Sequence, residues 1–493
     1  MIPQEFSETR TGSKIIITKT DKGIIMELWN NWMRLVNQLE ASCSRKKSFF
    51  WLVTVLIGFT IKFDFLGVTS IARGVGLLPN YYTCMLHLFN SNAVNLEELQ
   101  RLWIQLVLSQ FSGIVHINGR VIIVGDGIKI GKEGKKMPGV KWLHQESDSN
   151  SKANYIMGHS IQAVAVLAQG LSTCFAIPLI GKIHEGIRLC CGDSRTLLDK
   201  MFELLIGLNV SEGFYFVADK YYCSGRLMKQ LVDKNIHIVT MMKRNAVAYF
   251  PLIKPTQPKR GRPAKYGPHV KLFSLFDSDP PYITVPMPGN AKLMIEYCVI
   301  KLLWKPLGTL AQFVLVRHPE KGLSIVMSTD LTADPLSLIL IYSLRFKIEV
   351  FFKQAVHQMG TFMYRFWLKM MPPKKRRTGD QLLQLAPQKF KDAILRKLHA
   401  YHLFIQLGFI AQGLMHYVSM NCYQTVWRSF GTWLRTIRPN TLPSEKVVSL
   451  ALSRTYIEFL IDDTKHCIFK KFLRDRTDIS QIQPATHKEQ LAA

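Results

Sequence analysis

The segment from Tyr342 to Lys353 carries the polar side chains best placed to do chemistry. They lie three and four residues apart, so one face of a helix would carry all of them. They are Tyr342, Arg345, Glu349 and Lys353. The adjoining face is apolar and would pack on a core, which holds the Glu349 carboxylate between a guanidinium and an ammonium group. This placement suits a metal ligand among phosphate-binding cations, and the simpler alternative is an exposed amphipathic helix with Glu–Lys pairs.

Two aspartates follow the patterns of buried strands. Val-Ile-Ile-Val-Gly leads to Asp126, and Phe-Tyr-Phe-Val-Ala leads to Asp219. Sheets of α/β proteins bind ligands at the ends of their strands, so these carboxylates would converge if the strands are neighbours. Together with Glu349 they would repel one another unless a divalent cation such as Mg²⁺ neutralised them. Two such ions about 3.5–4 Å apart can drive an in-line phosphoryl displacement, whereas the alternative is two turn-capping acids.

The elements that must position these acids are those of a mixed α/β sheet. Strand patterns at 155–167, 173–180 and 237–242, with helices at 194–207 and 224–234, surround the two aspartate strands. Residues 251–330 are expected to form a β-rich insertion with strands at 293–301, 312–317 and 323–328. Phe366 and Trp367 are expected to pack in the core. The predicted regions are 1–115 (helical, DNA-binding), 116–250 (core, first part), 251–330 (insertion), 331–371 (core, Glu-bearing helix) and 372–493 (helical, possible dimerisation).

The helical N-terminal region contains two features that bear on partners. The glycine-broken stretch 67–80 suits a short helix and a turn, as in a helix-turn-helix that contacts DNA. The apolar run 49–61 ends after 13 residues at Lys62, short of the roughly 18–20 that a membrane span needs. We therefore expect a buried helix there and no membrane partner.

Composition favours a polyanionic partner. The 493 residues include 63 Lys and Arg against 35 Asp and Glu, a formal net charge of +28, which favours nucleic acid first and an anionic membrane second. The nine cysteines form no CxxC pair, which predicts free thiols in a reducing compartment and no zinc site.

Two basic loops are candidate DNA contacts, with a solvated linker and a nuclear-import-like patch as their alternatives. The first is similar to an AT-hook that enters a narrow minor groove, and the second would clamp phosphates. Their residues are Lys259, Arg260 and Arg262, and Lys374, Lys375, Arg376 and Arg377.

The order strand–Asp126, strand–Asp219, helix–Glu349 resembles the DDE insertion-sequence transposases, whose core is an RNase H-like mixed five-stranded sheet with helices. The helix motif is similar to the signature Tyr-x2-Arg-x3-Glu-x6-Lys of one large group of them, which also carries a β insertion before the Glu helix. The signature lysine falls on Val356, and Lys353 lies on the same helix face as a candidate substitute. The resemblance extends over about residues 121–367.

The resemblance implies a Mg²⁺-dependent transposase with two ions, for which Mn²⁺ can substitute. Such an enzyme hydrolyses a DNA strand at the terminal inverted repeats and joins the 3′-hydroxyl to target DNA, in many members through a hairpin. Asp126, Asp219 and Glu349 would be the catalytic metal ligands, and Tyr342, Arg345 and Lys353 would contact phosphate or a displaced base. The implied setting is a bacterial cytoplasm at the nucleoid, with a homodimer synapsing two ends. The alternative, which Val356 favours, is a catalytically decayed or repurposed DNA-binding protein on the same scaffold.

Overall fold

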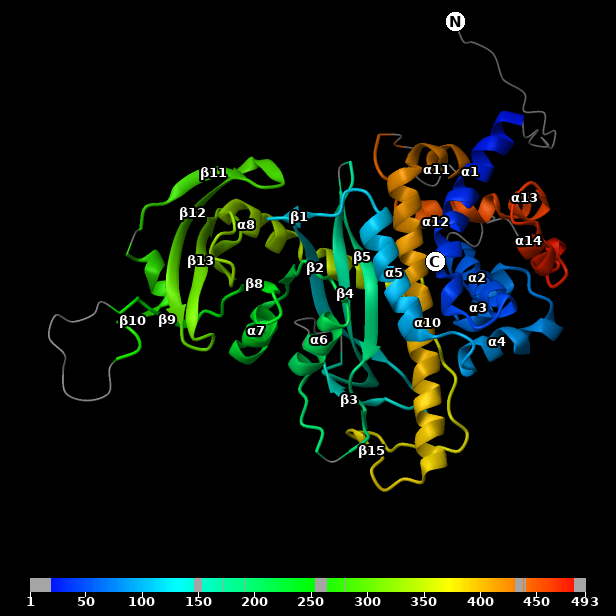
Figure 1. Ribbon diagram of the computed structural model, residues 1–493, viewed down its shortest axis with the longest axis horizontal. Helices are drawn as coiled ribbons and strands as arrows, with labels where there is room; N and C mark the ends of the chain where they lie inside the picture. The colour runs from blue at the N-terminus through cyan, green and yellow to red at the C-terminus, as the bar shows by residue number, and fades with distance from the viewer. Residues whose placement is uncertain are drawn as a thin grey trace, which may run out of the picture.

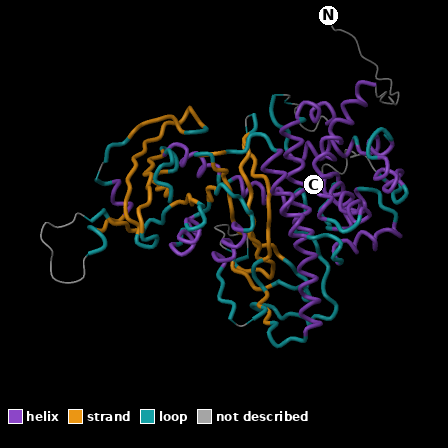
Figure 2. Tube along the Cα trace, viewed as in Figure 1, coloured by secondary structure: helices purple, strands orange, loops and turns teal. Residues whose placement is uncertain are grey.

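The fold joins a helical body, a central sheet and a curved β extension (Figure 1). The computed structural model describes residues 19–482 apart from 146–152, 172, 191, 253–263, 279, 431–437 and 439, with side chains from residue 26 onward. Figure 2 shows that most helices gather on one side, while the strands lie on the other together with a few shorter helices. The predicted AT-hook residues Lys259, Arg260 and Arg262 lie outside the described residues.

Five strands form the central sheet in the order β5-β4-β2-β7-β8. Strand β4 is antiparallel to β2 and β5, while β2, β7 and β8 run parallel. This order and these directions are those of an RNase H-like core, so the predicted fold is confirmed. The five strands are β2 (Arg120–Gly131), β4 (Tyr155–Gln169), β5 (Cys174–Ile183), β7 (Phe214–Val217) and β8 (His237–Met241). Short strands at its margins are β1 (His116–Ile117), β3 (Lys141–His144), β6 (Ile187–Arg188) and β15 (Gln381–Leu382).

The β-rich insertion continues the core sheet. Strand β14 pairs antiparallel with β8, with Val326 opposite Met241, so one hydrogen-bonded sheet runs from the core into the insertion. The predicted strands are all present and mostly longer than expected. They are β9 (Val247–Tyr249), β10 (His269–Lys271), β11 (Ile283–Met287), β12 (Asn290–Trp304), β13 (Thr309–His318) and β14 (Gly322–Ser328), with the 3₁₀ helix η4 (Leu272–Phe276).

Helices cover both faces of the core sheet. Helices α8 (Pro335–Leu344) and α9 (Lys347–His357) share one apolar cluster with β2, β4 and β7. Helices α6 (Leu197–Ile206) and α7 (Gly225–Val232) belong to the cluster on the opposite face. The long helix α10 (Gln388–Asn421) packs along β5, where Gln406 Nε2 donates to Leu179 O at 2.8 Å.

The helical body is built from both ends of the chain. Trp29 stacks on Phe459 with ring centroids 4.5 Å apart, and Trp29 Nε1 donates to Thr455 Oγ1 at 3.0 Å. The predicted N-terminal and C-terminal helical regions are therefore packed together, while their predicted boundaries and roles stay predictions. From the N-terminal side come α1 (Lys19–Val36), η1 (Asn37–Ser42), α2 (Lys46–Ile61), α3 (Val68–Gly74), η2 (Pro79–Tyr81), α4 (Tyr82–Asn90) and α5 (Leu96–Gln110). From the C-terminal side come α10, α11 (Tyr423–Phe430), α12 (Glu445–Arg454), α13 (Tyr456–Ile461), α14 (Cys467–Arg474) and η5 (Ile479–Gln481).

Two expectations about the helical body are confirmed. The apolar run 49–61 is the buried part of α2, which packs against α10 and α12. Helix α3 and helix α4 are separated by a turn in which Gly76 has φ +68°, so the predicted helix and turn exist. Among the described helices, α10 is long and apolar enough to cross a membrane, but 94% of its apolar window is buried inside the protein. This burial is that of a core helix.

The predicted single helix over Tyr342–Lys353 is wrong, because α8 ends at Leu344 and α9 begins at Lys347. Between them Arg345 N donates to Tyr342 O at 3.1 Å, a bond that spans three residues and tightens the turn. Arg345 and Phe346 keep right-handed helical dihedral angles, so the interruption is one tightened turn. Ile341 and Ile348 are both fully buried in the same apolar cluster, while Phe346 between them is exposed.

The packing of the N-terminal helices against the C-terminal helices can be tested at Phe404 of α10. This side chain is fully buried against Phe59 of α2 and Phe89 of α4. Phe404→Ala should lower the free energy of unfolding by about 3–5 kcal/mol, because it leaves a cavity where the ends meet. Urea unfolding followed by circular dichroism measures this. The control Leu385→Ala removes a side chain that is 95% exposed and should change stability by less than about 0.5 kcal/mol. Equal stability of the two variants would contradict the packing.

Candidate active site

Strand register brings the two aspartates together. Strands β2 and β7 are parallel with Val124 opposite Val217, so Asp126 and Asp219, each two residues further along, occupy equivalent positions. The prediction that this strand ends at Asp126 is wrong. Strand β2 runs on to Gly131, because β4 continues to pair with it. Asp219 follows the end of β7 and its Oδ1 accepts from Tyr221 N at 3.0 Å. It therefore also caps the 3₁₀ helix η3 (Lys220–Tyr222), as the turn-capping alternative expects.

The turn between α8 and α9 supplies a cation, Arg345, and the first turn of α9 supplies the third acid, Glu349. Arg345 Nη2 lies 2.8 Å from Glu349 Oε1, and Arg345 Nη1 lies 3.6 Å from Asp126 Oδ2. One guanidinium therefore bridges two of the three predicted carboxylates. Tyr342 also hydrogen-bonds the Arg345 side chain. Tyr342, Arg345, Glu349 and Asp126 therefore lie together, while their roles in metal and DNA binding stay predictions.

The surroundings of Asp126 disfavour its ionised form. Burial raises the pKa of Asp126 to about 6, and the charges of Asp219 and Glu349 act in the same direction. The Gly127 N–H and the Arg345 guanidinium act against this rise. Burial also raises the pKa of Tyr342, so its hydroxyl stays protonated at neutral pH. The cluster can therefore accept further positive charge.

Lys353 and Val356 do not join this cluster. The Lys353 side chain is exposed, and it forms no ion pair with any residue that the structure describes. Val356, at the position of the signature lysine, packs on the apolar cluster under α9. The substitution of Lys353 for the signature lysine stays a prediction.

Three polar residues that sequence reasoning missed lie beneath the aspartates. Tyr222 is buried, and its hydroxyl accepts from Gln162 Nε2 at 3.2 Å. Burial raises the pKa of Tyr222, and the charges of Asp126 and Asp219 add to the rise. Gln162 Oε1 also contacts His184 Nδ1 at 2.5 Å. A glutamine within the apolar stretch 161–168 of β4 was the available signal, because a buried amide needs partners.

The second basic loop is only partly open to a ligand. Lys375, Arg376 and Arg377 are exposed, whereas the Lys374 ammonium donates to Val140 O. Burial lowers the pKa of Lys374 to about 8. Lys374 therefore holds the loop in place, and the three exposed cations remain candidates for phosphate contact.

The donor set fits a divalent cation in its chemistry. Asp126, Asp219 and Glu349 offer only carboxylate oxygens, which Mg²⁺ prefers, and burial raises the pKa of Asp126, so a cation beside its carboxylate would be favourable. Within the described residues no three His, Cys, Asp or Glu side chains already stand at metal-ligand spacing. Arg345 lies between two of the acids.

Comparisons with known proteins place most of the chain in one family. Residues 36–292 match the family model described as DDE superfamily endonuclease, a range that covers more than half of the chain and includes Asp126 and Asp219. A search of the curated proteins finds no match. A solved piggyBac transposase synaptic complex with hairpin DNA aligns with 97% of this chain and 88% of that chain at 12% identity and a TM-score of 0.37.

The raised pKa of Asp126 predicts a pH-dependent stability. The folded chain binds this proton more tightly than the unfolded chain, whose Asp pKa is about 3.9, so the ionised carboxylate destabilises the fold above about pH 6. In EDTA, Asp126→Asn should therefore melt at a higher temperature than wild type at pH 8, and the difference should shrink as the pH falls towards 4. Thermal unfolding between pH 4 and 8 measures this.

Asp330 provides a control of opposite sign. Hydrogen bonds from Tyr215 and Thr332 outweigh burial and lower the pKa of Asp330 to about 2. Its ionised form therefore stabilises the fold above the unfolded pKa, and Asp330→Asn should melt lower than wild type at pH 8. A pH-independent shift in Asp126→Asn would contradict the assignment.

The bridge made by Arg345 predicts a second effect. Arg345→Gln leaves Asp126 and Glu349 without their shared cation, so the variant should melt at a lower temperature than wild type in EDTA. Added MgCl2 should then raise its melting temperature more than that of wild type, because ligand binding stabilises the folded state. Arg396→Gln, at an exposed position on α10, is the control. An equal Mg²⁺ shift in all three proteins would show that Arg345 and the cation do not share these acids.

Proposed function

Because the chain belongs to the DDE superfamily of endonucleases, we propose that it is a DNA transposase. It cuts DNA strands at the terminal inverted repeats of a mobile element and joins the freed 3′-hydroxyl to target DNA. The observation that supports the proposal is that Arg345 bridges Asp126 and Glu349, while Asp219 lies near enough to Asp126 for its charge to raise the pKa of Asp126.

The cofactor follows from the donor set. Two magnesium ions, or manganese in their place, held by Asp126, Asp219 and Glu349 would supply Lewis-acid activation of a water or hydroxyl and of the leaving oxygen. The chain itself supplies the geometry: the register of β2 and β7 fixes two of the acids, and the packing of α9 fixes the third.

Arg345 and Tyr342 are proposed to receive the DNA phosphate. A guanidinium makes paired hydrogen bonds with phosphate oxygens as readily as with carboxylates. The protonated Tyr342 hydroxyl, which hydrogen-bonds the same guanidinium, orients it and can donate to the substrate. Lys353, one helical turn beyond Glu349 and exposed, is proposed to contact DNA further from the reacting phosphate.

The wider DNA contacts rest on charge. A net charge of +28 favours long phosphate backbones. We assign the exposed cations Lys375, Arg376 and Arg377, the helices α3 and α4, and the loop cations Lys259, Arg260 and Arg262 to terminal-repeat and target DNA. Two ends must be held together, so the working unit is proposed to be a homodimer, acting at the nucleoid of a bacterial cytoplasm.

A specific observation supports a second candidate function. Val356 packs on the core where the signature has a lysine, which suits a DNA-binding protein on the same scaffold that has lost strand transfer. Both candidates predict binding to end DNA, and they differ in cleavage.

Replacing single acids tests the chemistry. Asp126→Asn, Asp219→Asn and Glu349→Gln should each reduce Mg²⁺-dependent nicking and joining of inverted-repeat DNA by on the order of a thousandfold, because each removes several kcal/mol of transition-state stabilisation. Binding of the same DNA should persist. A gel assay with labelled end DNA measures both steps.

Glu320→Gln is the matched control, since Glu320 is exposed in the turn between β13 and β14 and should leave cleavage unchanged. Undiminished nicking by Glu349→Gln would refute the proposed site. A wild-type protein that binds end DNA without cutting it would favour the decayed alternative.

A further inference from the structure

The segment 365–377, here called the basic strap, combines cations with an exposed aromatic side chain. It holds six Lys and Arg and no acid. Trp367 was expected in the core but is 65% exposed, and Met370 beside it is 48% exposed. An exposed indole is costly in water and is enriched where proteins make contacts, so its position calls for a partner.

The strap is held firmly against the body of the protein. Phe366 turns inward with its ring centroid 4.9 Å from that of Tyr364, and its carbonyl accepts from the Tyr401 hydroxyl at 2.8 Å. Leu368 N donates to Lys136 O at 2.9 Å, and Lys374 N donates to Lys135 O at 2.8 Å. Because the chain is fixed on both sides of Trp367, its exposure follows from a defined backbone.

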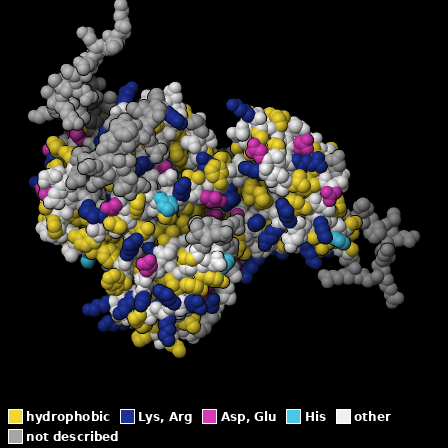
Figure 3. Space-filling model, turned by 180° about the vertical axis from the view of Figure 1, so that it is seen from behind, with side chains coloured by type: hydrophobic (Ala, Val, Ile, Leu, Met, Phe, Trp, Pro, Cys, Tyr) yellow, Lys and Arg dark blue, Asp and Glu magenta, His cyan; other side chains and the backbone are white. Residues whose placement is uncertain are grey.

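The same backbone bonds gather cations from a second segment. Lys135 and Lys136 belong to the turn before β3, more than two hundred residues earlier in the chain, and lie alongside the strap. Figure 3 shows many Lys and Arg side chains on the lower lobe of the molecule, with few acids among them. The backbone bonds therefore place the cations of two distant segments side by side.

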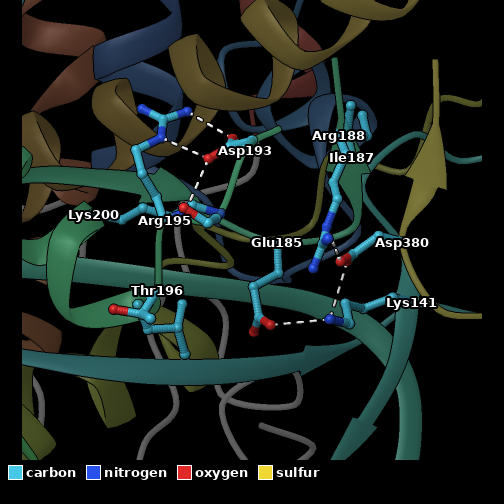
Figure 4. Close-up of a pocket in the computed structure, with 11 residues that line it drawn as sticks. Lys141, Glu185, Ile187, Arg188, Asp193, Arg195, Thr196, Lys200 and Asp380 are labelled. Atoms are coloured by element: carbon cyan, nitrogen blue, oxygen red, sulfur yellow. Dashed lines mark hydrogen bonds and ion pairs between the residues drawn. The ribbon is translucent and has the colours of Figure 1, made fainter. Parts of the chain in front are cut away.

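In a pocket near the strap, by contrast, basic side chains form ion pairs with acids (Figure 4). There Lys141 Nζ lies 3.0 Å from both Glu185 and Asp380, and Arg188 Nε lies 3.0 Å from Asp380. These ion pairs fix Asp380, three residues beyond the strap. In the strap no described carboxylate pairs with Arg365, Lys369, Lys375, Arg376 or Arg377, so its cations are available to an external anion.

We propose that the basic strap binds an unpaired segment of DNA, with Trp367 stacked on one base and the surrounding cations on the phosphates. Paired bases inside a duplex hide their faces, so an exposed indole gains a stacking partner only where a base is unpaired. The chemistry is sequence-tolerant, because every base offers an aromatic face. This inference deepens the proposed function by naming a contact for its DNA substrate.

Equilibrium binding in EDTA tests the strap without requiring cleavage. Fluorescence anisotropy would compare a single-stranded oligonucleotide with the duplex of the same sequence. Trp367→Ala should weaken single-strand binding on the order of tenfold and leave duplex binding within about twofold. Trp367→Phe should restore most of the loss, because a phenyl ring still stacks.

Two further variants separate stacking from charge. Arg376→Gln with Arg377→Gln should weaken both DNAs and reduce the salt dependence of binding by about one to two in slope. Ile468→Ala, which trims a side chain 67% exposed on α14 in the helical body, is the matched control and should change neither. Circular dichroism and sedimentation accompany each variant.

Three outcomes would overturn the stacking contact. They are unchanged single-strand binding by Trp367→Ala, an equal loss on both DNAs, or a changed oligomeric state with unchanged DNA binding, which would assign the surface to a protein partner. Because no step of the assay needs a metal or a cut, failure of the strap and failure of the proposed nuclease chemistry are told apart.

Discussion

Desolvation of the Asp126 carboxylate beside other acids is the constraint around which the site is arranged. Partial burial raises the pKa of Asp126 to about 6, and the charges of Asp219 and Glu349 add to the rise. A fold that places like charges together loses stability unless a cation compensates. Arg345 supplies part of the compensation through two contacts. The site is thus held together by a guanidinium whose geometry also suits phosphate.

The scaffold must resist this repulsion, and its packing explains how it does so. Strands β2 and β7 are fixed by parallel pairing, so Asp126 and Asp219 cannot separate without breaking the sheet. On the other side, Ile348, Phe351 and Phe352 anchor α9 to the sheet. The same apolar demand accounts for Val356, because that face of α9 is turned to the core. The helix that supplies Glu349 is therefore positioned mainly by burial of its apolar side.

Much of this arrangement could be predicted from residues alone. Alternating buried strands with terminal acids predict neighbouring carboxylates, and the helical spacing of Tyr342, Arg345 and Glu349 predicts their common face. The extension of β2 beyond Asp126 could not be predicted, because it depends on pairing with the long strand β4. The tightened turn at Arg345, which ends α8 and precedes α9, had no signal in the residue spacing either.

Other features depend on contacts between segments far apart in the chain. The two ends of the chain each read as helical, but their union depends on contacts such as that of Trp29 with Phe459. Phe366 and Trp367 read alike as core residues, and only the bonds of Leu368 and Lys374 to the distant turn decide which one turns outward.

The pocket beside the strap, the active site and the strap differ in how far their charged side chains are paired. In the pocket beside the strap, Lys141 and Arg188 are neutralised by acids and serve to join segments. At the active site one arginine is shared between two acids, so removing it leaves negative charge that a metal ion can satisfy. In the strap the cations face no described carboxylate. A polyanion is attracted mainly by cations that are not already paired with acids. The large positive net charge therefore matters for DNA binding chiefly in the strap. Ion pairs elsewhere keep DNA from competing with the contacts that hold the fold together.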